Sequence, residues 1–186
     1  MVIHAPSDTM KFYEGSPWRM RMRQAPTAAS STPILASCPR DPIEASKFPI
    51  DDTEGGCDDP IVEKWTGPYP WTRQHPAIDI TGFDGVSSDG QEIYNFCKLE
   101  GIINIALMGV HTNICILNRS FGIRQMTRLG FQVVLARDLT DAMYDPRKRP
   151  FVSHNRGVEL VVEHIESNWC PSVLGDDLTR VIPGSG

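Results

Sequence analysis

One cysteine of this chain stands where a protein could activate a nucleophile. Cys115 ends the segment 109–115, which directly follows the highly apolar run 102–108. Such a run is typical of a strand buried on both faces of a parallel sheet, and ligands bind beyond the carboxyl ends of such strands. We expect Cys115 in the first turn of the next helix, where unpaired N–H groups and the helix dipole favour thiolate over thiol. Cys115 is therefore a candidate nucleophile.

Each residue of this turn also has a structural interpretation. Free cysteines are often small buried hydrophobes, and Cys115 could be one. The side-chain oxygen of Thr112 or Asn113 could cap the helix. His111 could act as a base or a substrate donor, or as a hydrogen-bonded scaffold residue.

The elements that must position this turn follow from hydrophobic patterning. Val2 lies in an expected strand, and residues 17–24 can form a short helix. Apolar runs and glycine stops then predict alternating strands and helices, which imply parallel strands joined by right-handed crossovers. The fold class is α/β, with one domain over residues 1–186. The expected strands are 77–80, 102–108, 131–136 and 172–174, and the expected helices begin near Asp89 and span 113–129 and 153–168.

The region from about 25 to 75 has no sustained periodicity. It is rich in Pro, Gly, Ser and Asp, and a loop of this length in a compact domain usually has a function or is poorly ordered. We expect this irregular insert to wrap over the active face or an oligomer interface.

Composition restricts the partners and the compartment. The formal net charge is -5 and no basic stripe is present, which disfavours nucleic acid. No run approaches the roughly 20 apolar residues of a membrane span, so no membrane association is expected. The 5 cysteines are odd in number and form no CxxC pair, which favours a reducing, cytoplasmic setting.

Four segments, taken together and in order, resemble a branch of the isochorismatase-like cysteine hydrolases. They are VIHAPSDTMKFY at 2–13, GVHTNICILNRSFGIR at 109–124, LARDLTDAMYDP at 135–146 and SHNRGVELVVEHIE at 153–166. The glycine-led turn that ends in cysteine and an aliphatic residue is similar to the nucleophile signature of that family.

The resemblance implies a three-layer α/β/α fold with a mostly parallel central sheet and a catalytic Asp, Lys and Cys. Cys115 would attack a carbonyl carbon and form a thioester that water releases. Val110, His111, Thr112 and Asn113 would form the substrate and oxyanion pocket. The resemblance also implies a cis peptide between Val110 and His111. No cofactor is expected, and no metal, because Asp8 lacks the flanking histidines of the zinc-binding members.

Two features depart from the family pattern. The family Asp ends a first strand that has no counterpart here, so we expect that the chain begins late, through a mis-assigned start codon. The alternative is a real truncation that leaves a degraded or accessory product. No lysine lies between Lys64 and Lys98, and the nearest cation to the family Lys position is Arg73, which can orient a charge but transfers protons poorly.

The functional expectation is a cysteine hydrolase that acts on a small amide, imide or related carbonyl compound. The alternative is a catalytically inactive family member that serves as a small-molecule binding or scaffolding subunit. Family resemblance and unpaired strand edges further suggest a homo-oligomer.

Overall fold

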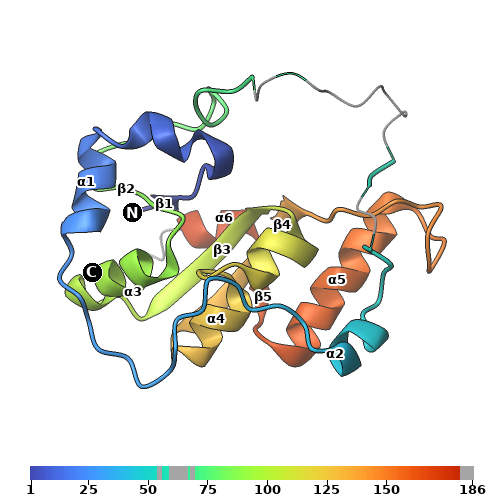
Figure 1. The fold of residues 1–186 in the computed structure, drawn as a ribbon. Helices are drawn as coiled ribbons and strands as arrows, with labels where there is room; N and C mark the ends of the chain where they lie inside the picture. The colour runs from blue at the N-terminus through green and yellow to red at the C-terminus, as the bar shows by residue number, and fades with distance from the viewer. Residues whose placement is uncertain (54–55, 59–66, 68–69, 181–186) are drawn as a thin grey trace. The chain divides into compact units, whose positions relative to one another are not determined.

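The computed structural model describes residues 1–53, 56–58, 67 and 70–180 (Figure 1). Its contacts divide the chain into two compact units. Unit 1 comprises Met1–Ala36 and Pro60–Ile102, and unit 2 comprises Ser37–Asp59 and Ile103–Gly186. Each unit contains its own parallel sheet together with helices. The chain is therefore a mixed α/β protein with parallel strands, as its sequence predicts.

In its described residues, unit 1 contains a two-stranded parallel sheet and three helical segments. In chain order these elements are β1 (Ile3–His4), the 3-10 helix η1 (Ser7–Tyr13), α1 (Pro17–Gln24), β2 (Gly85–Val86) and α3 (Gly90–Leu99). β1 pairs with β2, and α1 contacts both β2 and α3.

The helices of unit 1 begin where the sequence places capping residues. Ser16 Oγ accepts from the N–H of Arg19 at 3.2 Å, and Pro17 occupies the first turn of α1. Asp89 Oδ1 accepts from the N–H of Glu92 at 2.9 Å at the start of α3. Both expected helices are confirmed.

The strand expected at 77–80 is wrong. His75 to Ile78 form a turn, in which the N–H of Ile78 donates to the carbonyl of His75 at 2.9 Å. The strand lies later, at Gly85–Val86. The carboxylate of Asp84 fixes its start, because it accepts from the backbone N–H of Val2 at 2.8 Å.

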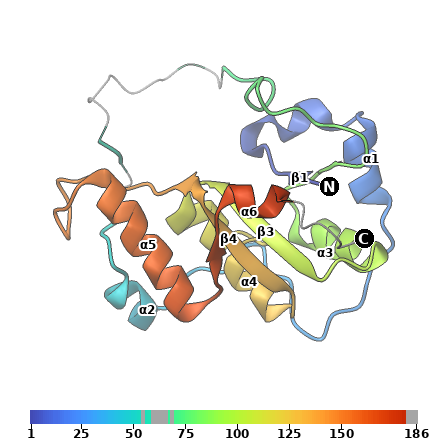
Figure 2. The same ribbon diagram turned by 180° about the vertical axis from the view of Figure 1, so that it is seen from behind.

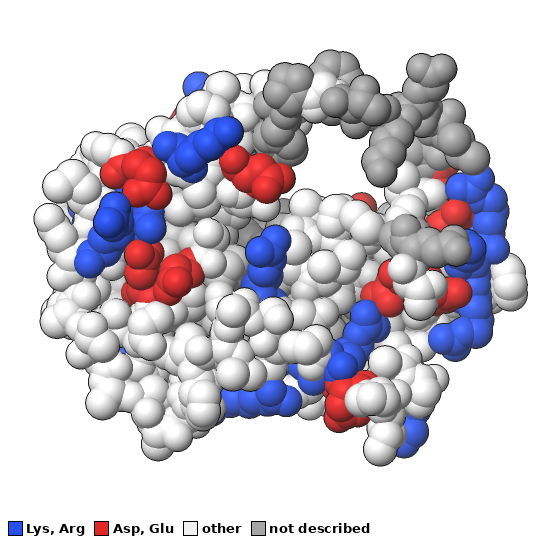
Figure 3. All heavy atoms as spheres, viewed as in Figure 1, with Lys and Arg blue, Asp and Glu red and all other residues white. Residues whose placement is uncertain are grey.

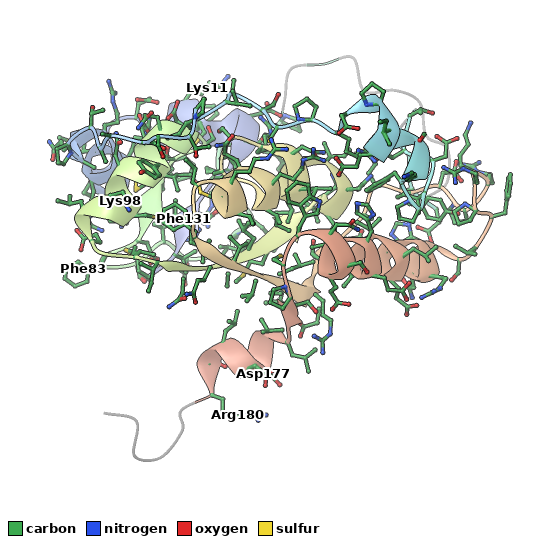
Figure 4. All side chains as sticks on the ribbon, turned by 90° about the horizontal axis from the view of Figure 1, so that it is seen from below. Lys11, Phe83, Lys98, Phe131, Asp177 and Arg180 are labelled. Atoms are coloured by element: carbon green, nitrogen blue, oxygen red, sulfur yellow. The ribbon has the colours of Figure 1, made fainter. Side chains whose placement is uncertain are left out.

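Unit 2 contains a three-stranded parallel sheet in the order β3-β4-β5. β5 leads directly into α6 (Figure 2). α4 and α6 both contact β4, and the view from below places them on opposite sides of it (Figure 4). The elements of unit 2 are α2 (Pro42–Lys47), β3 (Asn104–Val110), the π-helical turn η2 (Thr112–Ile116), α4 (Ile123–Arg128), β4 (Gln132–Asp141), α5 (His154–Asn168), β5 (Ser172–Val173) and α6 (Gly175–Thr179).

The single helix expected over 113–129 is interrupted. η2 and α4 are separated by a turn that ends at Gly122, where a Cβ would lie 2.8 Å from the carbonyl oxygen of Ile116. The turn is held from outside, because Ser37 forms an antiparallel bridge with Arg119 and the N–H of Cys38 donates to the carbonyl of Asn118 at 2.7 Å. A neighbouring segment therefore replaces helical hydrogen bonds at this point.

The remaining elements of unit 2 follow the sequence closely. β3, β4, α5 and β5 occur at the expected positions, although β4 continues to Asp141. Ser153 caps α5 by accepting from the N–H of Arg156 at 3.3 Å. Among the described residues of the 25–75 region, α2 forms the regular element.

Candidate active site at the carboxyl end of β3

Cys115 lies in η2, which begins two residues after β3 ends at Val110. The carbonyl oxygen of His111 accepts from the N–H groups of both Ile114 and Ile116 at 3.1 Å, so η2 closes tightly on the end of the strand. The peptide between Val110 and His111 is cis, as the family resemblance implied. The side chain of Cys115 is half-buried. The backbone that carries the thiol is therefore held by hydrogen bonds, while the thiol itself is partly accessible to solvent.

Thr112 joins the start of this turn to the neighbouring strand. Its Oγ1 lies 2.7 Å from Oγ1 of Thr140, which donates to the carbonyl of Gly109 at 2.7 Å. His111 occupies the capping position, without a side-chain cap bond. The expectation that Thr112 caps the helix is therefore wrong, because its hydroxyl pairs with β4 instead.

Asn113 joins the turn to two other segments. Its Nδ2 donates to Oδ2 of Asp52 at 2.9 Å and to the carbonyl of Met143 at 3.1 Å, while its Oδ1 accepts from the N–H of Met143 at 2.9 Å. The side chain is fully buried. Asn113 is therefore not a helix cap either, because the nitrogen and the oxygen of its side-chain amide both bind residues distant in sequence.

Asp52 comes from the irregular 37–53 segment and is held there by a cation. Arg40 NH2 donates to Asp52 Oδ2 at 2.7 Å, and both side chains are largely buried. The guanidinium of Arg40 also lies 3.7 Å from the centre of the Phe48 ring. The ion pair with Arg40 and the hydrogen bond from the amide of Asn113 offset the cost of burying the Asp52 carboxylate.

A histidine and a carboxylate lie at the end of β4. Asp141 is in register with Val110, and its Oδ1 lies 2.8 Å from Nε2 of His154. His154 Nδ1 lies 2.9 Å from the carbonyl oxygen of Tyr144. Burial lowers the pKa of His154, but the bonds to Asp141 and Tyr144 and the charges of Asp141 and Asp58 outweigh it and leave the pKa raised. The side chain of Tyr144 is fully buried.

The expected pocket residues differ in what they expose. Val110 is 58% exposed and His111 is half-buried, so both side chains are accessible. Thr112 and Asn113 are fully buried and can contribute only backbone groups. Arg73 belongs to unit 1, where its guanidinium donates to the carbonyl of Pro76 at 3.5 Å. Its role as a charge partner of Cys115 stays a prediction.

Three of the other four cysteines are buried. Burial raises the pKa of the Cys97 thiol to about 11, and burial together with the charge of Glu166 raises that of Cys170 to about 11. Cys38 is buried and accepts from Arg128 NH1 at 2.7 Å. Cys57 is half-buried. Cys115 and Cys57 are therefore the accessible thiols.

Sequence reasoning missed Arg40, Asp52, Thr140 and Met143, which hold the cysteine turn. Asp52 is separated from Asn113 by 61 positions, and Thr140 from Thr112 by 28. No local periodicity encodes such contacts. The only sequence signal was that the insert is long enough to return to the active face.

The charged surface carries both signs. On the face in Figure 3, Lys and Arg groups lie next to Asp and Glu groups. Within the described ranges, no group of three or more His, Cys, Asp or Glu side chains could hold a metal ion. No helix in this part of the chain is long and apolar enough to cross a membrane.

Fold and site together define an α/β protein with parallel sheets and a cysteine turn at the carboxyl end of a strand. No protein-family model, curated protein or solved structure matches the chain.

Proposed function

We propose that the protein is an isochorismatase-like cysteine hydrolase in which Cys115 attacks a small amide, imide or related carbonyl compound. The observation that carries the proposal is the position of a half-buried Cys115 in a turn directly after β3, braced by Thr112 and Asn113. The carboxyl ends of parallel strands are where α/β proteins bind ligands.

The proposed reaction has two steps. Cys115 gives up its thiol proton and the thiolate attacks the carbonyl carbon. A C–S bond forms, the C–N bond breaks, and the amine leaves with the proton that the thiol released. Water then attacks the thioester, which gives a carboxylic acid and regenerates the thiol. Because His111 already engages the N–H groups of Ile114 and Ile116, the oxyanion donors of this proposal are other backbone N–H groups of residues 110–113.

The proposal gives His111 and Val110 the substrate-facing positions, since their side chains are accessible. A three-layer fold and a homo-oligomer belong to the same proposal. A small-molecule substrate is expected from the family resemblance.

An acyl-transfer probe tests the proposal. p-Nitrophenyl acetate should acetylate Cys115 with a burst of p-nitrophenolate, and peptide mapping by mass spectrometry should locate the acetyl group there. C115A should abolish the burst, whereas C57A, which removes the other half-buried thiol, should retain it. Turnover is then followed as ammonia release from a panel of small primary amides and cyclic imides.

The result separates the two functional classes. Acetylation of Cys115 with ammonia release supports the hydrolase. Acetylation that is never hydrolysed, without turnover of any amide, supports the inactive binding subunit. A burst that survives C115A contradicts the nucleophile assignment.

A further inference from the structure

We infer that Asp52 is a positioning residue for the Cys115 turn and that Arg40 holds Asp52 in this role. The inference rests on the proposed function of Cys115. It gives the irregular 37–53 segment a task in the reaction, although no residue of that segment contacts the thiol in any described hydrogen bond.

The orientation of the Asn113 amide is determined by its partners. The N–H of Met143 can only donate, so it must face Oδ1 of Asn113, and the carboxylate of Asp52 can only accept when ionised, so it must face Nδ2. The two hydrogens of Nδ2 are shared between Asp52 and the Met143 carbonyl. The amide is fully satisfied and has one possible orientation.

Asp52 is itself fixed in place. Its Oδ2 accepts from Arg40 at 2.7 Å and from Asn113 at 2.9 Å, and only 12% of its side chain is exposed. The guanidinium of Arg40 is held over the Phe48 ring. Charge-assisted hydrogen bonds of this kind are short and strong, so the carboxylate presents a fixed acceptor to Asn113.

The position of Asn113 determines that of Cys115, which lies two residues later. The carbonyl of Asn113 accepts from Nδ2 of Asn118 at 3.0 Å, and the carbonyl of Cys115 accepts from the N–H of Arg119 at 3.1 Å. Hydrogen bonds to Asn118 and Arg119 therefore link the backbone of Asn113 and Cys115 to the turn that follows. Misplacement of a reacting atom by about 1 Å can cost on the order of 100-fold in rate.

Two substitutions separate positioning from general stabilisation. D52A and D52N both remove the charge that pairs with Arg40, but the side-chain oxygen of D52N can still accept from Arg40 as Oδ2 of Asp52 does. D52N keeps an oxygen that can accept from Asn113 Nδ2, whereas D52A leaves that donor without this partner. D51N is the matched control, because the carboxylate of Asp51 binds the N–H and hydroxyl of Thr53 instead.

The experiment measures the rate of Cys115 acetylation by p-nitrophenyl acetate at fixed pH, with folding checked by circular dichroism. D52A should lower the rate by about tenfold or more, D52N should restore most of the wild-type rate, and D51N should leave it unchanged. Equal loss in D52A and D52N, or a wild-type rate in D52A, overturns the inference.

A second pair of variants keeps the test decisive if D52A does not fold. N113D is isosteric but places a carboxylate against that of Asp52, so it should slow acetylation. In the double variant N113D/D52N the amide at position 52 can donate to the carboxylate at position 113, which reverses the direction of the original hydrogen bond. This variant should recover part of the acetylation rate, and no recovery overturns the inference. An inert wild-type Cys115 overturns the proposed function and the inference together, whereas a reactive Cys115 that is insensitive to Asp52 overturns the inference alone.

Discussion

The imidazole Nε2 of His154 lies 2.8 Å from Oδ1 of Asp141, which joins the start of α5 to the end of β4. The other ring nitrogen lies 2.9 Å from the carbonyl oxygen of Tyr144. Carbonyl and carboxylate oxygens accept hydrogen bonds, so only the doubly protonated ring donates to both. The geometry therefore favours the imidazolium, in agreement with the raised pKa of His154.

The first prediction concerns the pH dependence of this pair. Because the folded pKa of His154 is raised, its stabilising contribution is fully present below the ordinary value of about 6.5 and is lost as pH rises through the raised value. The free energy of unfolding of the wild type should exceed that of H154Q most at about pH 6, and the difference should shrink at alkaline pH.

Urea denaturation at several pH values measures this difference. His164 has a lowered pKa, mainly because of burial, and contributes with the opposite sign, but it is present in both proteins and cancels in the comparison. H75Q, at an exposed histidine, is the control substitution. A gap between wild type and H154Q that grows with pH would contradict the assignment.

The second prediction concerns a buried arginine. Arg124 is 2% exposed, pairs with Glu44 and lies over the Trp169 ring at 4.7 Å. E44A removes the acidic partner and leaves a buried charge, which should lower the free energy of unfolding by about 3 kcal/mol. E159A removes an exposed partner of Arg156 and should cost much less, because solvent screens an exposed pair. Urea denaturation compares the two variants. Equal decreases in the free energy of unfolding would show that the pair of Arg124 and Glu44 contributes no more than an exposed ion pair.

The third prediction concerns the packing of α5 on the loop that follows β4. A Cβ at Gly157 would lie 2.6 Å from Cε1 of Tyr144 and closer still to Cδ1, and that ring is fully buried. G157A should therefore lower the free energy of unfolding by roughly 1–3 kcal/mol through overpacking. G15A, where nothing lies within 4 Å of the added Cβ, should have little effect. A G157A variant as stable as the wild type by thermal melting would show that the Tyr144 ring moves freely.

Local signals in the sequence predicted the elements that local chemistry determines. Ser16, Asp89 and Ser153 begin their helices by accepting hydrogen bonds from their own first turns. The apolar run before Gly109 formed the expected strand. Caps and hydrophobic runs depend on residues that are close in the chain, so they can be recognised from one sequence alone.

What the sequence did not predict depends on distant partners. The break after Ile116 requires Ser37 and Cys38 to bind Arg119 and Asn118. The burial of Cys38 likewise depends on Arg128, 90 positions away. Thr112 and Asn113 were expected to cap a helix, but hydrogen bonds to β4 and the 37–53 segment replaced that local option.

The last prediction ranks the cysteines by their reaction with iodoacetamide. The thiolate is the reactive form, and it must also be reached by the reagent. Cys97 and Cys170 meet neither condition, because burial hides them and raises their pKa values to about 11. Cys38 is buried as well. We therefore expect labelling of Cys115 and Cys57 in the folded protein, with Cys115 labelled first because the proposed function requires an activated thiol.

Peptide mapping after brief exposure at mildly acidic pH measures this order, since an ordinary thiol is then almost wholly protonated and slow. In concentrated urea the five cysteines should react at similar rates, because burial and local charge no longer distinguish them. Access alone predicts that Cys57 and Cys115, both half-buried, react at comparable rates. Faster labelling of Cys115 than of Cys57 therefore supports activation of the thiol, and equal rates would contradict the expected order and count against a nucleophile in the turn after β3.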